Sequence, residues 1–297
     1  MYHTPVLLEK SVEGLCVKPD GLYADVTFGG GGHSRQILDS IQSGHLFAFD
    51  QDADAAKNAF DDDRFTFIPQ NFRFFKNFIQ LHTSEKLDGI LADLGVSSYQ
   101  FDTPERGFST RFDGKLDMRM DQLNPIDATI VINTYTHAAL TKIFSVYGEV
   151  QNAHLVAADI IQARNSQVVE TTRALKEAVK RHTPKGKENK VLAQIFQALR
   201  IEVNQEMAVL EQFLGQCADM LKPGGRLVVI SYHSLEDRLV KNFMKTGNAL
   251  GRLEKDFFGN SMSPYKLVTR KPIVPTETEI EQNSRARSAR LRIAERI

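Results

Sequence analysis

The stretch DVTFGGGGHS, residues 25–34, follows a short apolar run and precedes a segment compatible with a helix. Consecutive glycines let the backbone approach a ligand closely, and the N-terminus of the following helix offers unpaired N–H groups. The next apolar run ends at Asp50, where a carboxylate can accept hydrogen bonds from both ribose hydroxyls of an adenosine. The stretch therefore predicts a strand, a loop that binds a nucleotide-like ligand, and a helix. The alternative is a flexible turn with a solvated Asp50.

Short apolar runs continue on both sides of this loop. GLYADVT, HLFAFD, RFTFIPQ and DGILADLG lie between residues 21 and 95, separated by helix-compatible segments such as SRQILDSI and ADAAKNAF. This alternation favours βαβ units and a parallel sheet, and hence a doubly wound, Rossmann-like α/β fold. A fifth run, GRLVVIS at 225–231, appears only after a long gap, so we expect the sheet to be interrupted. YKLVTRKPIVP is expected to add one or two closing strands.

Within this gap, apolar residues recur with the period of an α-helix. Four apolar residues between 192 and 199 recur at the spacing of one helix face, and HAALTKIFSVYG, AHLVAADIIQAR and TRALKEAVKRH also read as helices. A structureless loop of this length would be unusual inside a compact domain. We therefore predict a first part of the core at 1–104, an inserted helical domain for substrate recognition at 105–204, and a second part of the core with a basic tail at 205–297.

Composition restricts the classes of function. Lys+Arg and Asp+Glu are equal at 37 each in 297 residues, so a nucleic-acid partner would have to meet local basic patches. Cys16 and Cys217 show neither CxxC spacing nor a His-rich neighbourhood, so we expect no disulfide framework and no metal site. The chain shows no signal-peptide pattern and no apolar run long enough for a membrane span. We expect a cytoplasmic protein without a membrane partner.

Two further motifs follow predicted strands. Asp93 lies at or just past the end of GILADLG, and Tyr232 and His233 follow GRLVVI directly. Ligands of doubly wound sheets bind beyond the carboxyl ends of the strands, so these side chains would border one cleft if the two strands are neighbours. Asp93, Tyr232 and His233 are therefore candidate catalytic residues. The alternative is structural, with Asp93 capping a helix or turn and His233 held by hydrogen bonds.

Basic residues gather in two places. Five of them crowd the end of the chain, and a second group lies in the predicted insertion: Arg285, Arg287, Arg290, Arg292 and Arg296, then Arg173, Lys176, Lys180, Arg181, Lys185, Lys187 and Lys190. Each can contact phosphate groups, so the two patches are expected to flank an RNA strand. Solvated helix faces and a frayed tail are the alternative. The RNA-binding candidates are Arg285, Arg287, Arg290, Lys185 and Lys187.

At these residues the chain resembles the bacterial ribosomal RNA small subunit methyltransferase H family, which modifies cytosine N4 in the decoding region of 16S ribosomal RNA. The resemblance runs nearly end to end, through HTPVLL at 3–8, TFGGGGHS, DLGVSS, ERGFS at 105–109, LDMRM at 116–120, SYHSLEDR and the Arg-rich tail. Departures from the family pattern are Val26 and Ser284, with Tyr99 where Pro is commoner. None removes a hydrogen-bond donor or a carboxylate.

The resemblance implies a class I methyltransferase domain that uses S-adenosyl-L-methionine, with an inserted all-helical domain, and 16S ribosomal RNA or the small ribosomal subunit as partner. Carried over by position, it implies these cofactor-binding residues: Gly31, Gly32, His33, Asp50, Phe72, Asp93 and Gln100. Asp93 is the first choice for an acceptor that holds the amino hydrogens of cytosine, with Tyr232 or His233 as partner. The residues alone leave open a nicotinamide oxidoreductase, although Ser34 interrupts the GxGxxG pattern, and a non-enzymatic RNA-binding protein. A homodimer also stays open.

Overall fold

The computed structural model describes residues 5–297, and its residues divide into two compact units. One unit contains the residues up to Gly95 together with Met207–Ile297, and the other is Val96–Glu206. The insertion thus begins at Val96 and ends at Glu206, where the sequence suggests 105 and 204. His3 and Thr4 of the HTPVLL stretch lie outside the described residues.

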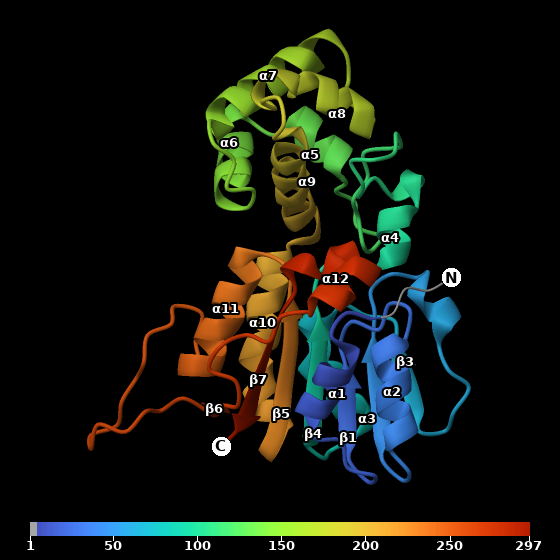
Figure 1. The fold of residues 1–297 in the computed structure, drawn as a ribbon, viewed down its shortest axis with the longest axis vertical. Coiled ribbons are helices and arrows are strands. Elements are labelled where there is room, and N and C mark those ends of the chain that lie inside the picture. The colour runs from blue at the N-terminus through green and yellow to red at the C-terminus, as the bar shows by residue number, and fades with distance from the viewer. Residues whose placement is uncertain (1–4) are drawn as a thin grey trace. The chain divides into compact units, whose positions relative to one another are not determined.

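A seven-stranded sheet forms the first unit, in the order β3-β2-β1-β4-β5-β7-β6 (Figure 1). The first five strands pair in parallel, whereas β7 runs antiparallel to both β5 and β6. The sheet confirms the predicted α/β class and its interruption between β4 and β5. The strands are β1 (Leu22–Asp25), β2 (His45–Phe49), β3 (Phe65–Ile68), β4 (Leu87–Asp93), β5 (Leu221–Ser231), β6 (Tyr265–Leu267) and β7 (Arg290–Arg296).

The helices of this unit are α1 (Leu8–Leu15), α2 (Gly32–Ser40), α3 (Phe75–His82), α10 (Glu206–Met220), α11 (Ser234–Thr246) and α12 (Glu277–Gln282). The predicted helix in ADAAKNAF is reduced to the short 3-10 helix η1 (Ala55–Asn58). A side-chain hydrogen bond forms just before this helix: the Asp52 carboxylate accepts the N–H of Asp54 at 3.1 Å. Such local bonds compete with the helical pattern.

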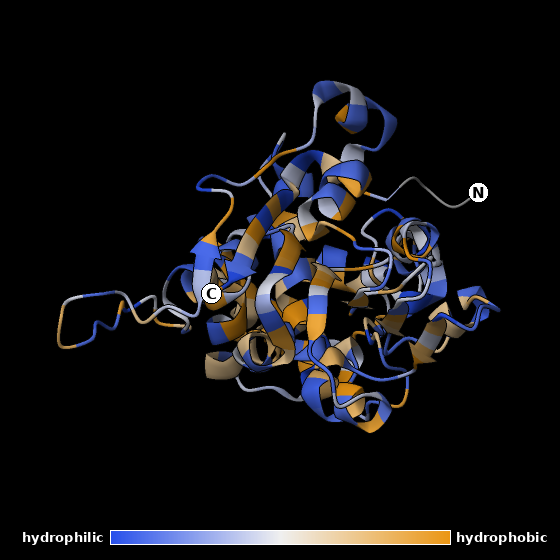
Figure 2. Ribbon diagram, turned by 90° about the horizontal axis from the view of Figure 1, so that it is seen from below, coloured by the Kyte–Doolittle hydropathy of each residue, from blue (hydrophilic) through white to orange (hydrophobic). Residues whose placement is uncertain are grey.

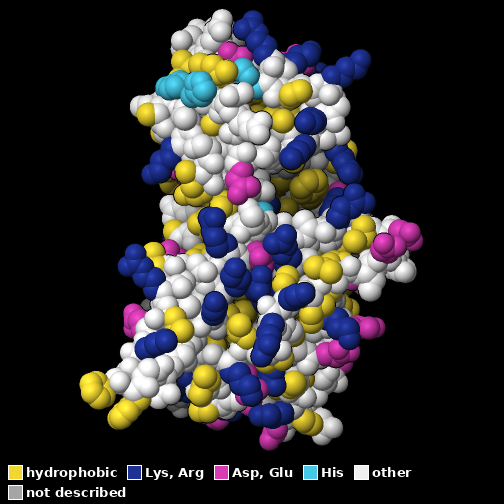
Figure 3. Space-filling model, turned by 60° about the vertical axis from the view of Figure 1, so that its left-hand side comes forward, with side chains coloured by type: hydrophobic (Ala, Val, Ile, Leu, Met, Phe, Trp, Pro, Cys, Tyr) yellow, Lys and Arg dark blue, Asp and Glu magenta, His cyan; other side chains and the backbone are white. Residues whose placement is uncertain are grey.

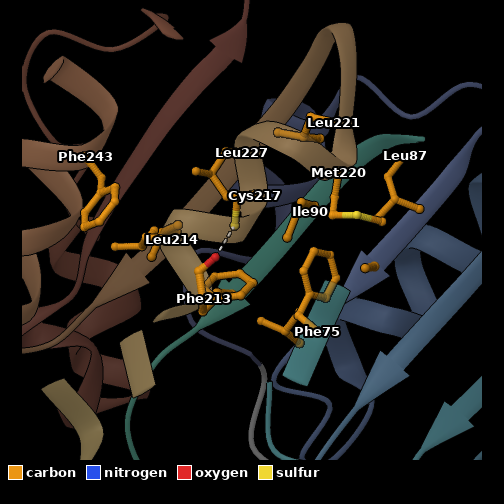
Figure 4. Close-up of a cluster of buried hydrophobic side chains, with 14 of the residues drawn as sticks. Phe75, Leu87, Ile90, Phe213, Leu214, Cys217, Met220, Leu221, Leu227 and Phe243 are labelled. Atoms are coloured by element: carbon orange, nitrogen blue, oxygen red, sulfur yellow. Dashed lines mark hydrogen bonds between the residues drawn. The ribbon is translucent and has the colours of Figure 1, made fainter. Parts of the chain in front are cut away.

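Apolar side chains pack on both faces of the sheet. In β5, Leu227 and Val229 join one cluster, while Val228 and Ile230 join another on the opposite face. This alternation follows from the two-residue period of a strand. Figure 4 shows the first cluster, where the Cys217 thiol points to the carbonyl oxygen of Phe213 at 3.2 Å. The sheet is therefore covered on both sides, as a parallel sheet requires.

The basic tail contains a strand of this sheet. In β7, Leu291 is 0% and Ile293 4% exposed, so both are core residues. The interpretation of the tail as a frayed basic segment is therefore wrong, because its apolar residues pack into the core of the sheet unit. The apolar residues alternate with Arg290 and Arg292, which is the two-residue period of a strand. The number of arginines makes the segment read as a solvated basic tail instead.

The second unit is helical around a core of its own. Its elements are α4 (Ser98–Asp102), η3 (Pro104–Arg106), α5 (Ala128–Thr134), α6 (His137–Val146), α7 (Ala153–Ser166), α8 (Thr172–Ala178), η4 (Lys180–His182) and α9 (Glu188–Asn204). Thr136 and Thr171 cap α6 and α8 with their hydroxyl groups. Within residues 5–297, no helix has the length and apolarity that a membrane crossing demands.

Candidate functional site

Asp93 and Tyr232 meet at the carboxyl ends of two neighbouring strands. Asp93 ends β4, and Tyr232 follows the last residue of β5, its parallel neighbour. The Tyr232 hydroxyl donates a hydrogen bond of 2.8 Å to Oδ1 of Asp93. The sheet therefore brings together two of the three side chains that the sequence suggests for catalysis.

Asp93 is held in place but keeps one oxygen available. Its backbone N–H donates to the Thr27 hydroxyl at 2.6 Å, and its side chain remains 22% exposed. Burial raises the pKa of Asp93 to about 6, although the nearby His33 and the Tyr232 hydrogen bond both act to lower it. His33 Nδ1 lies 3.9 Å from Oδ2, which is too far for a hydrogen bond. Oδ2 is thus an acceptor with spare capacity.

His33 lies in the first turn of α2 and is 6% exposed. Its Nε2 is 3.2 Å from the carbonyl oxygen of Val6. Because a carbonyl oxygen only accepts, Nε2 carries the proton in this contact. The backbone thus orients the ring so that Nδ1 faces Asp93.

Asp50 closes the glycine loop from the end of β2. Its Oδ2 accepts the N–H of Gly29 at 2.8 Å, and Oδ1 accepts the N–H of Asp52 at 2.9 Å. Burial raises the pKa of Asp50 to about 6, against the lowering effect of these two hydrogen bonds. A carboxylate offers about four lone-pair sites, so each oxygen retains the capacity to accept a ligand hydroxyl.

Asp25, at the end of β1, accepts hydrogen bonds from residues on both sides of the same glycine loop. It is 1% exposed, and it accepts the Ser34 hydroxyl at 2.7 Å and the Thr27 N–H at 3.1 Å. Burial raises the pKa of Asp25, with the nearby His33 acting in the opposite direction. Sequence reasoning did not select Asp25, although its position at the end of β1, directly before the glycines, was a usable signal.

The glycines at 31 and 32 are required by packing within the protein. Gly31 has a φ of 77°, and a Cβ atom there would lie 2.9 Å from the Phe60 ring and 3.0 Å from that of Phe28. A Cβ atom on Gly32 would lie 2.1 Å from Pro5. These two positions therefore need glycine even before a ligand is considered.

Phe72 and Gln100 lie in different units. Phe72 begins η2 (Phe72–Phe74) after β3, and its half-buried ring meets Phe213 edge to face at 5.2 Å. Gln100 belongs to the second unit, where it is buried and forms a capping box with Ser97. The amide oxygen of Gln100 accepts the Ser97 N–H at 3.0 Å, so helix capping explains this residue within its own unit.

His233 caps α11. Its Nδ1 accepts the N–H of Glu236 at 3.4 Å, which agrees with the structural alternative for this residue. The Glu236 carboxylate in turn accepts the N–H of Tyr232 at 2.9 Å. Glu236 therefore positions Tyr232, a role that sequence reasoning missed. The signal was the spacing of a capping box, with Glu three residues after the cap.

The basic candidates have different surroundings. Lys185 and Lys187 are exposed on either side of Gly186, which has a φ of 81°. Arg287 is exposed and Arg285 half-buried in η5 (Ser284–Ser288).

The remaining arginines of the tail are tied to the sheet unit. Arg290 and Arg292 both pair with Asp237, at 3.1 Å and 2.7 Å. Arg296 donates to the carbonyl oxygens of Ala218 and Pro264. The Arg290 side chain is still 50% exposed, whereas that of Arg292 is only 10% exposed. Arg292 is therefore a structural residue.

Known proteins are similar to this chain over its whole length. The MraW methylase family matches residues 1–297. The chain is 58% identical to the ribosomal RNA small subunit methyltransferase H of Flavobacterium johnsoniae, over 100% of this chain and 98% of the relative. It is 55% identical to the protein of the same name from Bacteroides thetaiotaomicron, over 99% and 97%. A solved putative rRNA methylase from Clostridium thermocellum aligns with a TM-score of 0.47 at 12% identity, covering 100% and 99% of the two chains.

Proposed function

The chain belongs to the MraW methylase family, and on that premise we propose that it methylates the N4 amino group of a cytosine in the decoding region of 16S ribosomal RNA, with S-adenosylmethionine as donor. The substrate is this RNA, alone or within the small ribosomal subunit, and the compartment is the cytoplasm. The observation that carries the proposal is the hydrogen bond between Tyr232 and Asp93, which leaves a carboxylate oxygen available at the sheet edge beside the glycine loop.

The carboxylates of the first unit suit a cationic cofactor. S-adenosylmethionine supplies an electrophilic methyl group on a positively charged sulfonium, together with ribose hydroxyls and an ammonium group. Asp25, Asp50 and Asp93 all have raised pKa values because burial leaves their negative charge incompletely compensated. A cationic ligand would supply that compensation. Asp50 would accept the ribose hydroxyls, and Asp93 would lie near the reacting groups.

Asp93 can activate the amino group of cytosine. That nitrogen is a poor nucleophile because its lone pair is delocalised into the ring. An acceptor that holds an amino hydrogen localises the lone pair and stabilises the positive charge that develops on nitrogen. Tyr232 fixes Oδ1 of Asp93, so Oδ2 would serve as this acceptor. Once the methyl group is attached, the ammonium is acidic, and Asp93, with a pKa of about 6, can accept its proton.

The positions of the two cysteines disfavour methylation at cytosine C5, because that reaction needs a thiolate nucleophile beside Asp93. Cys217 is 0% exposed in the apolar core, and burial raises the pKa of its thiol. Cys16 follows the end of α1 rather than the carboxyl end of a strand. An amino nitrogen is therefore the better acceptor for this site.

The test is to methylate small subunits or 16S RNA that lack the modification, with S-adenosylmethionine carrying a deuterated methyl group. Digestion to nucleosides and mass spectrometry should find the label in N4-methylcytidine, and fragment mapping should place it in the decoding region. The Asp93→Asn variant is the matched control and should give little product. Label in 5-methylcytidine, in a ribose or in another base would refute the proposal.

A further inference from the structure

A long segment between α11 and β6, residues 248–263, projects from the sheet unit (Figures 1 and 2). Its arms meet in an isolated antiparallel bridge between Lys255 and Ser261. Figure 3 shows hydrophobic atoms at the end of a projection on a face rich in Lys and Arg. We call residues 252–262 the hairpin. Nothing in the proposed reaction uses it.

The tip of the hairpin is a defined turn. The Asp256 carboxylate accepts the N–H groups of Phe258 at 2.9 Å and Asn260 at 2.8 Å. The Asn260 amide also donates to it at 3.0 Å, and this bond is the main reason that the pKa of Asp256 is lowered. Gly259 has a φ of 85°, which favours glycine in the turn. The local bonds therefore hold the tip without help from the core.

This turn presents two adjacent aromatic rings to solvent. Phe257 is 98% and Phe258 85% exposed, and their rings meet edge to face with centroids 5.7 Å apart. Residues so exposed add almost nothing to the stability of the core. Clustered exposed apolar side chains typically mark an interaction site.

The charge of the segment that contains the hairpin favours one class of partner. Residues 245–271 contain six basic and two acidic side chains, a net charge of +4 in a chain whose net charge is zero. All six basic side chains are exposed, and none forms an ion pair within residues 5–297: Lys245, Arg252, Lys255, Lys266, Arg270 and Lys271. The hairpin itself carries two basic and two acidic residues, so the excess positive charge lies on either side of it in the chain. Exposed cations flanking two exposed aromatic rings suit a polyanion whose bases can stack.

We propose that the hairpin is an RNA-binding element, in which Phe257 and Phe258 stack on unpaired bases while the surrounding cations contact phosphates. The inference rests on the proposed function for its RNA substrate. A second copy of the chain is a poorer occupant, because two such surfaces would bring like charges together.

Tryptophan fluorescence tests this contact without requiring methyl transfer. The chain contains no tryptophan, so Phe257→Trp introduces a single fluorophore at the tip. Titration with unmodified 16S RNA should quench its emission by base stacking. The matched control is Leu81→Trp, at a residue of α3 that is 77% exposed, and its emission should stay nearly constant. Anisotropy of labelled RNA measures total binding in the same samples.

The outcomes separate the two proposals. Quenching at position 257 but not at position 81 supports the hairpin contact. RNA binding without quenching at position 257 would overturn it and leave the proposed function intact. Absence of binding by the wild type and both variants, to unmodified 16S RNA and to unmodified small subunits alike, would contradict both proposals. A change in emission that follows protein concentration without RNA would assign the tip to self-association, and this too would overturn the inference.

Affinity provides a second measurement. Replacing both Phe257 and Phe258 with Ala should raise the Kd for RNA by about thirtyfold or more, since each base stacked on an aromatic ring contributes at least about fivefold and two are lost. Arg252→Gln with Lys255→Gln should make the dependence of log K on log salt shallower by about 1.4 units, because each phosphate contact to a single strand contributes about 0.7. Both variants should melt like the wild type and bind S-adenosylmethionine normally. Unchanged Kd and salt dependence in both would contradict the proposal.

Discussion

The hydroxyl of Tyr232 donates to the carboxylate of Asp93 across two neighbouring strands, at a distance of 2.8 Å. Burial and the adjacent negative charge of Asp93 both raise the pKa of Tyr232 well above its ordinary value, so the phenol stays protonated and acts only as a donor. The Tyr232 N–H is itself bound by Glu236. Both ends of this tyrosine are thus fixed, and the carboxylate has one defined orientation.

Replacing Tyr232 with Phe should shift the pH dependence of methyl transfer. The hydrogen bond lowers the pKa of Asp93, so its loss should raise that pKa above its value of about 6. If ionised Asp93 is the acceptor, kcat/KM falls as pH falls through this pKa, and the acidic limb should move up by about one unit. A limb at the wild-type position, in a variant with normal cofactor affinity, would argue against Asp93 as the acceptor.

Asp93→Asn should lower activity and raise stability together. The amide oxygen still accepts from Tyr232, but the anionic acceptor is lost, so turnover should fall far more than cofactor affinity. Because the folded-state pKa is raised to about 6 from 3.8, Asp93 favours folding when protonated, and that contribution is lost as pH rises through about 6.

The variant should therefore gain about 1–3 kcal/mol in the free energy of unfolding at pH 8, and much less at pH 4. Chemical denaturation of the ligand-free protein at the two pH values measures this difference. An equal effect at both would show that Asp93 carries no such penalty. Turnover within about threefold of wild type, less than 1 kcal/mol of barrier, would remove it from the chemistry.

Asp50→Ala should weaken S-adenosylmethionine binding by roughly 1.5–3 kcal/mol, the usual loss for hydrogen bonds to a charged group. It also leaves the N–H groups of Gly29 and Asp52 without their carboxylate, so part of the loss reflects a looser glycine loop. Calorimetry with S-adenosylmethionine measures the effect. Unchanged affinity would place the ribose elsewhere.

The parallel strands were predictable because each apolar run ends at a polar or glycine residue and the period then changes. β7 was not, since Arg290 and Arg292 disguise its alternation. What makes that strand compatible with burial is Asp237, 55 residues before Arg292 in the sequence, which neutralises the arginine at 2.7 Å. A long-range charge pair of this kind leaves no trace in a local pattern.

In the candidate site, too, some features follow from local sequence and others depend on contacts between residues distant in the chain. The neighbourhood of Asp93 and Tyr232 follows from the rule that ligands bind at the carboxyl ends of parallel strands. The need for glycine at 31 and 32 depends instead on Phe28, Phe60 and Pro5, which only the folded chain brings near. Whether His233 faces a ligand or caps α11 is likewise decided by side-chain orientation.

Lys185 and Lys187 should contact RNA through charge alone. Both are exposed in the turn before α9, and neither forms an ion pair within the described part of the chain. Replacing both with Gln should weaken RNA binding and make its salt dependence shallower by about 1.4 units, about 0.7 for each lost phosphate contact to a single strand. Filter binding over a salt series measures this slope. Arg173→Gln is a suitable comparison, because Arg173 already pairs with Asp113. A wild-type slope in the double variant would exclude this turn as an RNA contact.

The arginines of the C-terminal segment should separate into structural and RNA-binding residues. Arg292→Gln leaves Asp237 buried with a weaker partner, so the free energy of unfolding should fall by about 3–5 kcal/mol, the typical effect of breaking a buried pair. The hydrogen bonds from Arg292 and Arg290 outweigh burial and keep the pKa of Asp237 low. The difference in the free energy of unfolding between wild type and variant should therefore shrink as pH falls and Asp237 becomes protonated.

Arg287 is exposed, and Arg287→Gln should leave the melting temperature unchanged while weakening RNA binding at low salt. Thermal melts and RNA titrations on the two variants form a crossed comparison. If Arg287→Gln bound RNA like the wild type across the salt series, the segment would contribute to folding alone.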